Sequence, residues 1–434
     1  MITKDVFARR RERFYDGLGE GVALLFAAPE ALYGHDTHYR YRPDPDLFYL
    51  TGFAEPEAVG VFDAEKRRYS LFVRPRDRER ETWDGRRAGV KGAVDTHGAW
   101  KAHPISELAE RLPELVRGHV VLHHAWGLSE ASDRVVSTVL SRFRREARDP
   151  RPGPSLQKDP LHVLHELRLF KEPEEVAVMQ RSADIAAQGH REAMKAARPG
   201  RHEYEIEGLL ERTFRAAGAS GPAYASIVAS GANATILHYV ENRRRIEADD
   251  LVLVDAGCEL HGYASDITRT FPASGRFTKE QKRVYEIVLA AQKAAIAKAV
   301  VGNRYIDAHD VARETMVDGL LDLGLLKGRR AKILAGTSDK KFLLHRTSHW
   351  LGLDVHDRGR YNDEKGEPRL LEPGMVLTVE PGLYFREDEK GVPKEWLGIG
   401  VRIEDDVLVT QTGPRVLSEK APKELDAVLA LTAR

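Results

Sequence analysis

The sequence contains almost no cysteine, since Cys258 is the only one among 434 residues. A single thiol excludes an intramolecular disulfide and a metal cluster held by several thiolates. Cys258 stands inside an apolar, strand-like run, so we interpret it as a small buried side chain rather than as a nucleophile.

The chain also lacks net charge and long apolar runs. Lysine plus arginine and aspartate plus glutamate number 67 each, which gives no indication of binding to nucleic acid or to a membrane surface. The longest early apolar run, Val22–Ala28, ends at Pro29 and is far too short to span a bilayer. The first residues, Met1–Asp5, are polar and do not resemble a signal peptide. We therefore expect a cytoplasmic protein with neither nucleic-acid nor membrane partners.

The length of the chain predicts two domains, residues 1–165 and 166–434. Short alternating runs in the first part give way to long amphipathic helices in the second. In the first, strand-like runs alternate with helical ones, which indicates an α/β layer. The expected strands are Val22–Phe26, Ala58–Phe62, Tyr69–Val73 and Val120–His123, and the expected helices are Ile105–Leu112 and Ala131–Arg144. The proline-bearing segment 149–160 is typical of a link near a domain boundary.

The second domain reads as a helix pair, strands, a second helix pair and strands, which predicts an α+β class. The expected helices are Pro173–Ala197, Tyr204–Ala217, a helix from the capping box at Thr278 to Val301, and Asp307–Leu323. The expected strands are Ala223–Ala229, Thr235–Tyr239, the hairpin at 251–271 and most of the chain from Phe342. The order suggests a structural duplication without a repeat in the residues.

The hairpin carries two aspartates between strand-forming residues. With Leu260 and His261 at the centre of its turn, Asp255 and Asp266 would oppose each other and share a face. Facing carboxylates raise one another's pKa unless a cation lies between them, and a divalent metal ion is the simplest such cation. The alternatives are two solvated aspartates, or a bulge at Gly257 that spoils this register.

Three later stretches place polar side chains in apolar, strand-like surroundings. They are 344–357 with His345, His349 and His356, 375–384 with Glu380 and Tyr384, and 398–406 with Arg402 and Glu404. Glu380 closes an apolar run, which is a poor place for an unpaired carboxylate. Arg402 and Glu404 are two residues apart, so on a strand they share a face. Taken singly, each has an ordinary interpretation as a solvated carboxylate, a surface ion pair or a structural histidine.

Taken in order, five of these residues resemble the metal ligands of the pita-bread metallopeptidases: Asp255, Asp266, His349, Glu380 and Glu404. The surrounding sequence resembles the aminopeptidase P (Xaa-Pro aminopeptidase) branch, as in Ser-Asp-Ile-Thr-Arg-Thr-Phe-Pro at 265–272 and Ser-His-Trp-Leu-Gly-Leu-Asp-Val-His-Asp at 348–357. In the first domain, Pro-Asp-Leu-Phe-Tyr-Leu-Thr-Gly-Phe at 45–53 resembles the creatinase-like domain of that family. The resemblance implies an α+β fold, with a C-terminal pita-bread catalytic domain preceded by an α/β creatinase-like domain.

The resemblance further implies two divalent metal ions, with Mn²⁺ as the expected ion. Four carboxylates and one imidazole form an oxygen-rich set that suits Mn²⁺ better than a structural zinc. The charge of two divalent ions would balance that of the acids. In the family, the two ions share one water, lower its pKa and present hydroxide to the Xaa-Pro carbonyl.

Roles for the neighbouring residues follow from the same resemblance. Glu380 is expected to pass the proton of the water to the leaving proline nitrogen. The three histidines His238, His345 and His356 would polarise the carbonyl, stabilise the gem-diolate and contact the residue after the bond. Arg402 is expected to orient Glu404 or a neighbouring carboxylate, and Tyr384 to donate to the same network.

Two positions bear on substrates and partners. Arg346 stands where some relatives carry glycine, which leaves the shape of that loop open but removes no ligand. Trp83 resembles a tryptophan that reaches the site of a neighbouring subunit in relatives, although an exposed aromatic side chain is an equal alternative. We expect a homo-oligomer, either a dimer or a tetramer.

The expected function is an exopeptidase that releases the N-terminal residue from peptides with proline in the second position. The alternative is a prolidase restricted to Xaa-Pro dipeptides, which must capture the carboxylate of the proline. The polar loops 358–369 and 386–394 would decide between an open and a closed end of the site. A peptide-binding protein on this fold would lack the ligands, and a creatine-type amidinohydrolase would lack this metal set.

Overall fold

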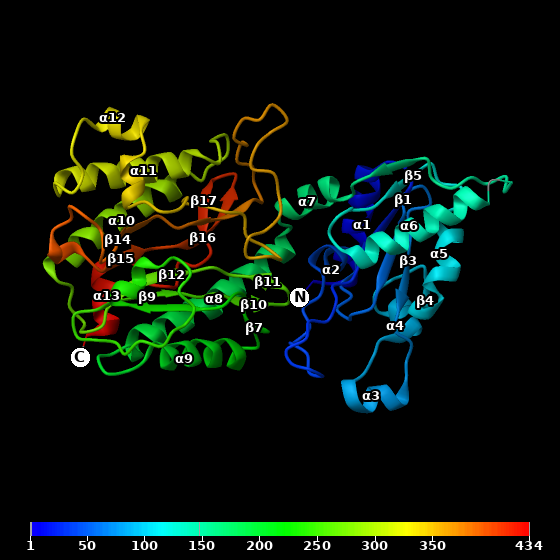
Figure 1. The fold of residues 1–434 in the computed structure, drawn as a ribbon, viewed down its shortest axis with the longest axis horizontal. Helices are drawn as coiled ribbons and strands as arrows, with labels where there is room; N and C mark the ends of the chain where they lie inside the picture. Colours follow the sequence, from blue (N-terminus) through cyan, green and yellow to red (C-terminus); the bar gives the residue numbers. More distant parts are fainter. Residues whose placement is uncertain (1, 147, 434) are drawn as a thin grey trace. The chain divides into compact units, whose positions relative to one another are not determined.

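The computed structural model describes residues 2–146 and 148–433, and the chain divides after Arg168 into two compact units (Figure 1). Among the described residues, no helix combines the length and the apolar composition that are needed to cross a bilayer. The two units are described separately below.

The first unit contains one mixed sheet of six strands in the order β4-β3-β2-β1-β5-β6. The strands are β1 (Val22–Phe26), β2 (Val59–Asp63), β3 (Arg68–Val73), β4 (Lys101–Pro104), β5 (Val121–His123) and β6 (Leu156–Lys158). The helices are α1 (Lys4–Leu18), α2 (Pro45–Thr51), α3 (Arg78–Asp84), α4 (Gly89–Asp95), α5 (Leu108–Val116), α6 (Glu130–Arg145) and α7 (Leu161–Leu169). Apolar residues of the central strands form its core with α5 and α6. The α/β layer predicted from the sequence is confirmed.

Helix α1 was not predicted, because its sequence is dominated by charged residues. Its core face consists of Val6 and Phe14 together with Arg10, which is fully buried. The guanidinium of Arg10 lies 4.2 Å from the centroid of the Tyr49 ring and donates to the Tyr49 carbonyl at 3.2 Å. An arginine that packs its stem and stacks its head on an aromatic ring thus replaces an apolar residue in the helix pattern.

The second unit has two helix pairs on either side of short sheets, in the predicted order (Figure 1). The helices are α8 (Pro173–Ala196), α9 (Glu203–Ala216), α10 (Lys279–Lys298), α11 (Asp307–Asp322), α12 (Arg330–Ala335) and α13 (Leu425–Thr432). The first strands are β7 (Gly221–Pro222), β8 (Ile227–Ser230), β9 (Leu251–Asp255), β10 (Cys258–Leu260), β11 (Tyr263–Ala264) and β12 (Thr268–Pro272). The later strands are β13 (Val376–Val379), β14 (Gly382–Phe385), β15 (Ile399–Arg402), β16 (Asp405–Thr410) and β17 (Gly413–Val416).

The start of helix α10 agrees with the capping signal in the sequence. Thr278 accepts from the backbone N–H of Gln281 at 3.2 Å, and the Gln281 side chain accepts from the Thr278 N–H at 2.9 Å. The predicted capping box therefore starts α10. Between the helix pairs, the strands run in the sheets β12-β9-β8, β11-β10-β7, β13-β16-β17 and β14-β15.

The predicted strand Thr235–Tyr239 is wrong. Gly231–Thr235 forms a 3₁₀ turn, and no regular element follows it up to Tyr239. Apolar side chains of this segment pack on Ile227 and Leu253 instead of joining a ladder. The Tyr239 hydroxyl donates to Glu203 at 2.8 Å, which holds the segment against α9.

The predicted register of the central hairpin is also wrong, by one position in the turn. His261 and Gly262 are the central turn residues, with φ of 51° and 86°, a conformation favoured in tight hairpins. As a result Asp255 pairs with Thr268 instead of Asp266. Asp266 lies between β11 and β12, and its backbone N–H donates to Asp406 at 3.1 Å.

Gly257 allows the two hairpin strands to pass closely where the ladder is interrupted. A Cβ atom at this position would lie 1.6 Å from the carbonyl oxygen of Ser265. No other residue fits that approach without a shift of the backbone. The glycine therefore marks a close backbone contact next to Asp266.

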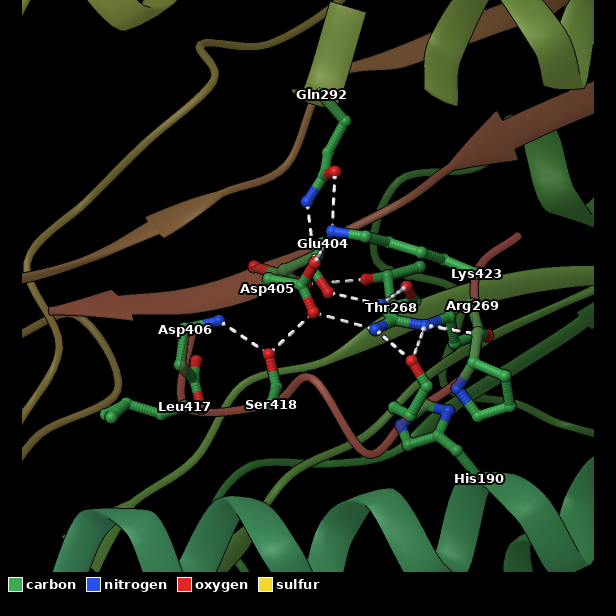
Figure 2. Close-up of polar contacts among 12 residues, drawn as sticks. His190, Thr268, Arg269, Gln292, Glu404, Asp405, Asp406, Leu417, Ser418 and Lys423 are labelled. Carbon is green, nitrogen blue, oxygen red and sulfur yellow. Dashed lines mark hydrogen bonds and ion pairs between the residues drawn. The ribbon is translucent and has the colours of Figure 1, made fainter. Parts of the chain in front are cut away.

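A buried charge cluster ties a late segment of the chain to the central strands (Figure 2). Asp405, which is fully buried, accepts from Arg269 at 2.7 Å, from Lys423 at 2.5 Å and from Ser418 at 2.6 Å. Arg269 also donates to the backbone carbonyl of Glu404 at 2.5 Å and to that of Ala421 at 2.7 Å. The cluster thus fixes the backbone at the start of β16.

We expect Asp405→Ala to destabilise the second unit by about 3–5 kcal/mol, because it leaves the buried charge of Arg269 without its carboxylate. The matched control is Glu424→Ala, which removes the half-exposed partner of Lys293 at 2.7 Å and should cost less than about 1 kcal/mol. Urea unfolding of the metal-free proteins measures both. Equal midpoint shifts for the two variants would contradict the assignment.

Candidate active site

All five expected metal ligands line one cavity of about 470 Å³ in the second unit. The same wall includes His238, His345, His356 and Arg402, whereas Tyr384 is fully buried behind it. The lining also includes the apolar side chains of Ile227, Leu237, Val240 and Val355. The cavity therefore combines a concentration of acids with an apolar surface that could contact a substrate side chain.

The acids reach the cavity from the ends of different strands. Asp255 ends β9, Asp266 precedes β12, Glu380 follows β13, and Glu404 lies between β15 and β16. Their backbones are held by the sheets and by cross-contacts. The Glu380 N–H donates to the Thr347 carbonyl at 2.8 Å, and the Glu404 N–H donates to the Thr268 carbonyl at 3.1 Å. Strand ends thus fix the separations between the carboxylates.

Asp266, His349 and Glu404 form the tightest group, with one ligand atom from each within 4.8 Å of the others. His349 Nε2 lies 3.4 Å from Asp266 Oδ2 and 3.6 Å from Glu380 Oε1. Its Nδ1 donates to the Trp350 carbonyl at 3.0 Å, which turns the Nε2 lone pair toward the acids. Ligand atoms at about 2.0–2.2 Å from one ion are spaced in this way, so the group fits a metal site.

Asp255 and Asp266 converge on one hydroxyl although they are not paired in the ladder. The Tyr224 hydroxyl lies 2.7 Å from Asp255 Oδ1 and also contacts Asp266 Oδ1. One O–H supplies a single proton for two carboxylates, so the second carboxylate needs a proton or a cation. Tyr224 was missed by the sequence reasoning, because nothing near it in the sequence indicates a site.

The pKa shifts in the cavity arise from the burial of several acids together and from the charges that face them. Burial raises the pKa of Glu380 to about 7, against the opposing charges of His349 and Arg402. Burial and the charge of Asp266 raise the pKa of Glu404 well above its usual range. For His349, Asp266 and Glu380 outweigh burial and raise the pKa to about 9. The raised pKa values of the two glutamates reflect an excess of buried negative charge that divalent cations would neutralise, and the donor set fits such ions.

Arg402 is held by three partners and supports the ligands from behind. It donates from Nη2 to Asp255 at 2.6 Å, from Nη1 to Tyr384 at 2.8 Å and from Nε to Thr268 at 3.2 Å. Thr268 in turn donates to Glu404 at 2.6 Å. Arg402 therefore contacts Asp255 directly and reaches Glu404 through Thr268. The sequence led us to expect contact with Glu404 or a neighbouring carboxylate, but it did not indicate the part of Thr268.

The hydrogen bonds of His345 define its tautomer. Its Nδ1 lies 2.7 Å from the Arg346 carbonyl, which can only accept, so Nδ1 carries the proton. Its Nε2 accepts from the Tyr384 hydroxyl at 2.7 Å. Burial and the charge of Arg402 lower the pKa of His345 to about 4, so the ring is neutral.

The other two histidines lie on the open side of the cavity. His238 and His356 are both exposed. The His356 ring stands edge-on to that of His349, with the centroids 4.4 Å apart. Trp83 belongs to the first unit, where it is 83% exposed on α3, a helix without buried residues.

Comparison with known proteins agrees with this geometry. The model of metallopeptidase family M24 matches residues 177–411, and that of the aminopeptidase P N-terminal domain matches residues 7–123. The chain is 43% identical to the Xaa-Pro aminopeptidase of Escherichia coli, over 99% of this chain and 98% of the relative. It is 42% identical to the Xaa-Pro aminopeptidase of Haemophilus influenzae, over 98% and 96% of the two chains.

Solved structures show the same fold. Aminopeptidase PepP of Pseudomonas aeruginosa superposes with a TM-score of 0.98 at 46% identity, over 100% of this chain and 98% of that one. A variant of E. coli aminopeptidase P in complex with substrate superposes with a TM-score of 0.96 at 42% identity, over the same shares. The predicted α+β class, a pita-bread domain preceded by a creatinase-like α/β domain, is confirmed. The chain therefore belongs to metallopeptidase family M24, in the group of the aminopeptidases P.

Proposed function

We propose that this protein is a metal-dependent Xaa-Pro aminopeptidase, which releases the N-terminal residue from peptides with proline in the second position. The observation that carries the proposal is the gathering of Asp255, Asp266, His349, Glu380 and Glu404 in one cavity. The near full-length relatives named Xaa-Pro aminopeptidase support it.

We propose that the five ligands hold two divalent ions, with Mn²⁺ as the physiological metal. Hard oxygen donors predominate in the set, which favours Mn²⁺ over a structural zinc. An E. coli relative has been solved in a zinc-substituted form, so the metal is a matter for measurement. When bound, such ions polarise a carbonyl and lower the pKa of water.

In this proposal Glu380 moves the proton. A carboxylate beside the reacting water can accept a proton from it and pass that proton on. It takes the proton from the attacking water and delivers it to the proline nitrogen as the bond breaks. An amide nitrogen leaves as an amine and not as an anion, so cleavage of the bond to proline depends on this delivery.

The remaining residues divide into two roles. His238 and His356, on the open side, would contact the carbonyl oxygen and the residue after the bond. Neutral His345, whose Nδ1–H is donated to the Arg346 carbonyl, lies 3.6 Å from Glu380 Oε2 and would help to stabilise the gem-diolate beside that carboxylate. Arg402 and Tyr384 act through their contacts with Asp255 and His345, as positioning residues.

The proposal includes a cytoplasmic homo-oligomer, a dimer or a tetramer. The exposure of Trp83 on α3 supports an interface on the first unit. Light scattering after gel filtration, with Trp83→Ala as the variant, measures the assembly.

Glu380→Gln should lower kcat by about 10²–10⁴-fold, because an amide cannot carry the proton. Metal content, measured by mass spectrometry, should remain substantial in the variant. Glu387→Gln, an exposed glutamate outside the cavity, is the control. Normal turnover of the Glu380 variant with bound metal would reject the proton-transfer role.

Metal should stabilise the protein more at high pH than at low pH. The pKa values of Glu380, Glu404 and His349 are all raised in the metal-free fold. The stability they contribute is present below their unfolded pKa values and is lost as pH rises through the folded ones. We expect the Tm gain from Mn²⁺ to grow between about pH 5.5 and about pH 8. A gain independent of pH, measured by scanning calorimetry, would refute this linkage.

Peptide length distinguishes the aminopeptidase from the prolidase alternative. We expect Xaa-Pro tripeptides and longer peptides to be cleaved at rates at least comparable to those of Xaa-Pro dipeptides. A kinetic series with one N-terminal residue and an increasing number of residues after proline tests this. Efficient hydrolysis confined to the dipeptide would indicate a prolidase.

A further inference from the structure

One cation of the cavity wall is not used by the proposed mechanism. The wall contains two arginines, Arg402 and Arg346. Arg402 is 4% exposed and is engaged by Asp255, Tyr384 and Thr268. Arg346 is exposed, and within residues 2–146 and 148–433 no carboxylate lies close enough to form an ion pair with it. Its guanidinium is therefore available to a ligand.

The backbone that carries Arg346 is held rigidly on both sides. The Arg346 carbonyl accepts from His345 Nδ1 at 2.7 Å. The next residue, Thr347, accepts the Glu380 N–H on its carbonyl at 2.8 Å and contacts His309 Nδ1 through its hydroxyl at 3.0 Å. The base of the arginine is thus fixed relative to the candidate proton carrier, while its long stem remains adjustable.

Negative and positive side chains are unevenly distributed in the cavity. Asp255, Asp266, Glu380 and Glu404 concentrate negative charge inside, and Arg346 supplies positive charge on the exposed side. A peptide is polarised in the opposite sense, with an ammonium group at its first residue and a carboxylate at its last. Such complementarity orients a ligand during encounter and favours one direction of binding.

We propose that Arg346 is a specificity-determining residue that binds a carboxylate beyond the scissile bond. A guanidinium is a planar fork that matches a carboxylate in two parallel hydrogen bonds. The preferred substrates are then short Xaa-Pro-Yaa peptides that carry negative charge after the proline. The charge comes either from the C-terminal carboxylate or from an acidic side chain at the third position. This inference rests on the proposed aminopeptidase activity and names the substrate class of that site.

The test uses two pairs of peptides, and the members of each pair differ mainly in this charge. The first pair is Ala-Pro-Ala as free acid and as C-terminal amide. The second pair is Ala-Pro-Asp and Ala-Pro-Asn, both as C-terminal amides. We expect the wild type to favour the charged member of at least one pair by about 10-fold in kcat/KM, mainly through KM. Arg346→Gln should abolish this preference while the neutral amide is cleaved at the wild-type rate. Arg346→Lys should restore part of it, and Arg346→Glu should reverse it.

The free-acid pair and the aspartate pair separate the two sources of the carboxylate. Arg283→Gln, an exposed arginine on α10 outside the cavity, is the matched control and should change neither ratio. The preference should also weaken with added salt, because an exposed ion pair is screened. Equal kcat/KM within both pairs in the wild type, or ratios unchanged in Arg346→Gln, would overturn the inference. Failure to cleave even the neutral amide would instead refute the proposed function.

Discussion

The site depends on keeping four carboxylates close together in one cavity, with little room for water around each of them. Mutual repulsion among buried acids is severe, and the wall offers only Arg402 as a permanent internal counter-charge. The chain resolves this by anchoring each acid to a strand end, so that repulsion cannot spread them apart. The negative charge of the carboxylates can be reduced either by bound protons or by bound divalent cations. Protons and metal ions therefore compete for the same carboxylates.

The residues around the candidate ligands range from fully buried and multiply bonded side chains to exposed ones. Deepest lies the cluster of Asp405 with Arg269 and Lys423, which holds the backbone next to Glu404. Above it, Arg402 and Thr268 orient the carboxylates themselves. Outermost, His238, His356 and Arg346 are exposed. Such an order suits an enzyme that must hold its ions without change while it accepts peptides that differ after the proline.

The sequence predicted most elements that depend on local chemistry. It failed for one tight turn and for contacts between distant parts of the chain. The capping box at Thr278 and the apolar strand β1 are local, and both were placed correctly. The register of the hairpin depends on which two residues form its turn. The prediction was wrong because His261, a non-glycine residue, adopts a positive φ in this tight turn together with Gly262. Tyr224 gave no signal, and the contact of Asp406 with the Asp266 backbone could not be foreseen, because the partners are far apart in the sequence. The five candidate ligands were proposed from their order in a family pattern, because spacing alone left ordinary interpretations open for each.

The buried charge cluster around Asp405 has a consequence for the synthesis of the chain. Ser418 and Lys423 lie later in the chain than every candidate ligand. A nascent polypeptide that has already exposed Glu404 on the ribosome still lacks the groups that hold the adjoining backbone. The pocket can therefore assemble fully only after this late segment has emerged and docked.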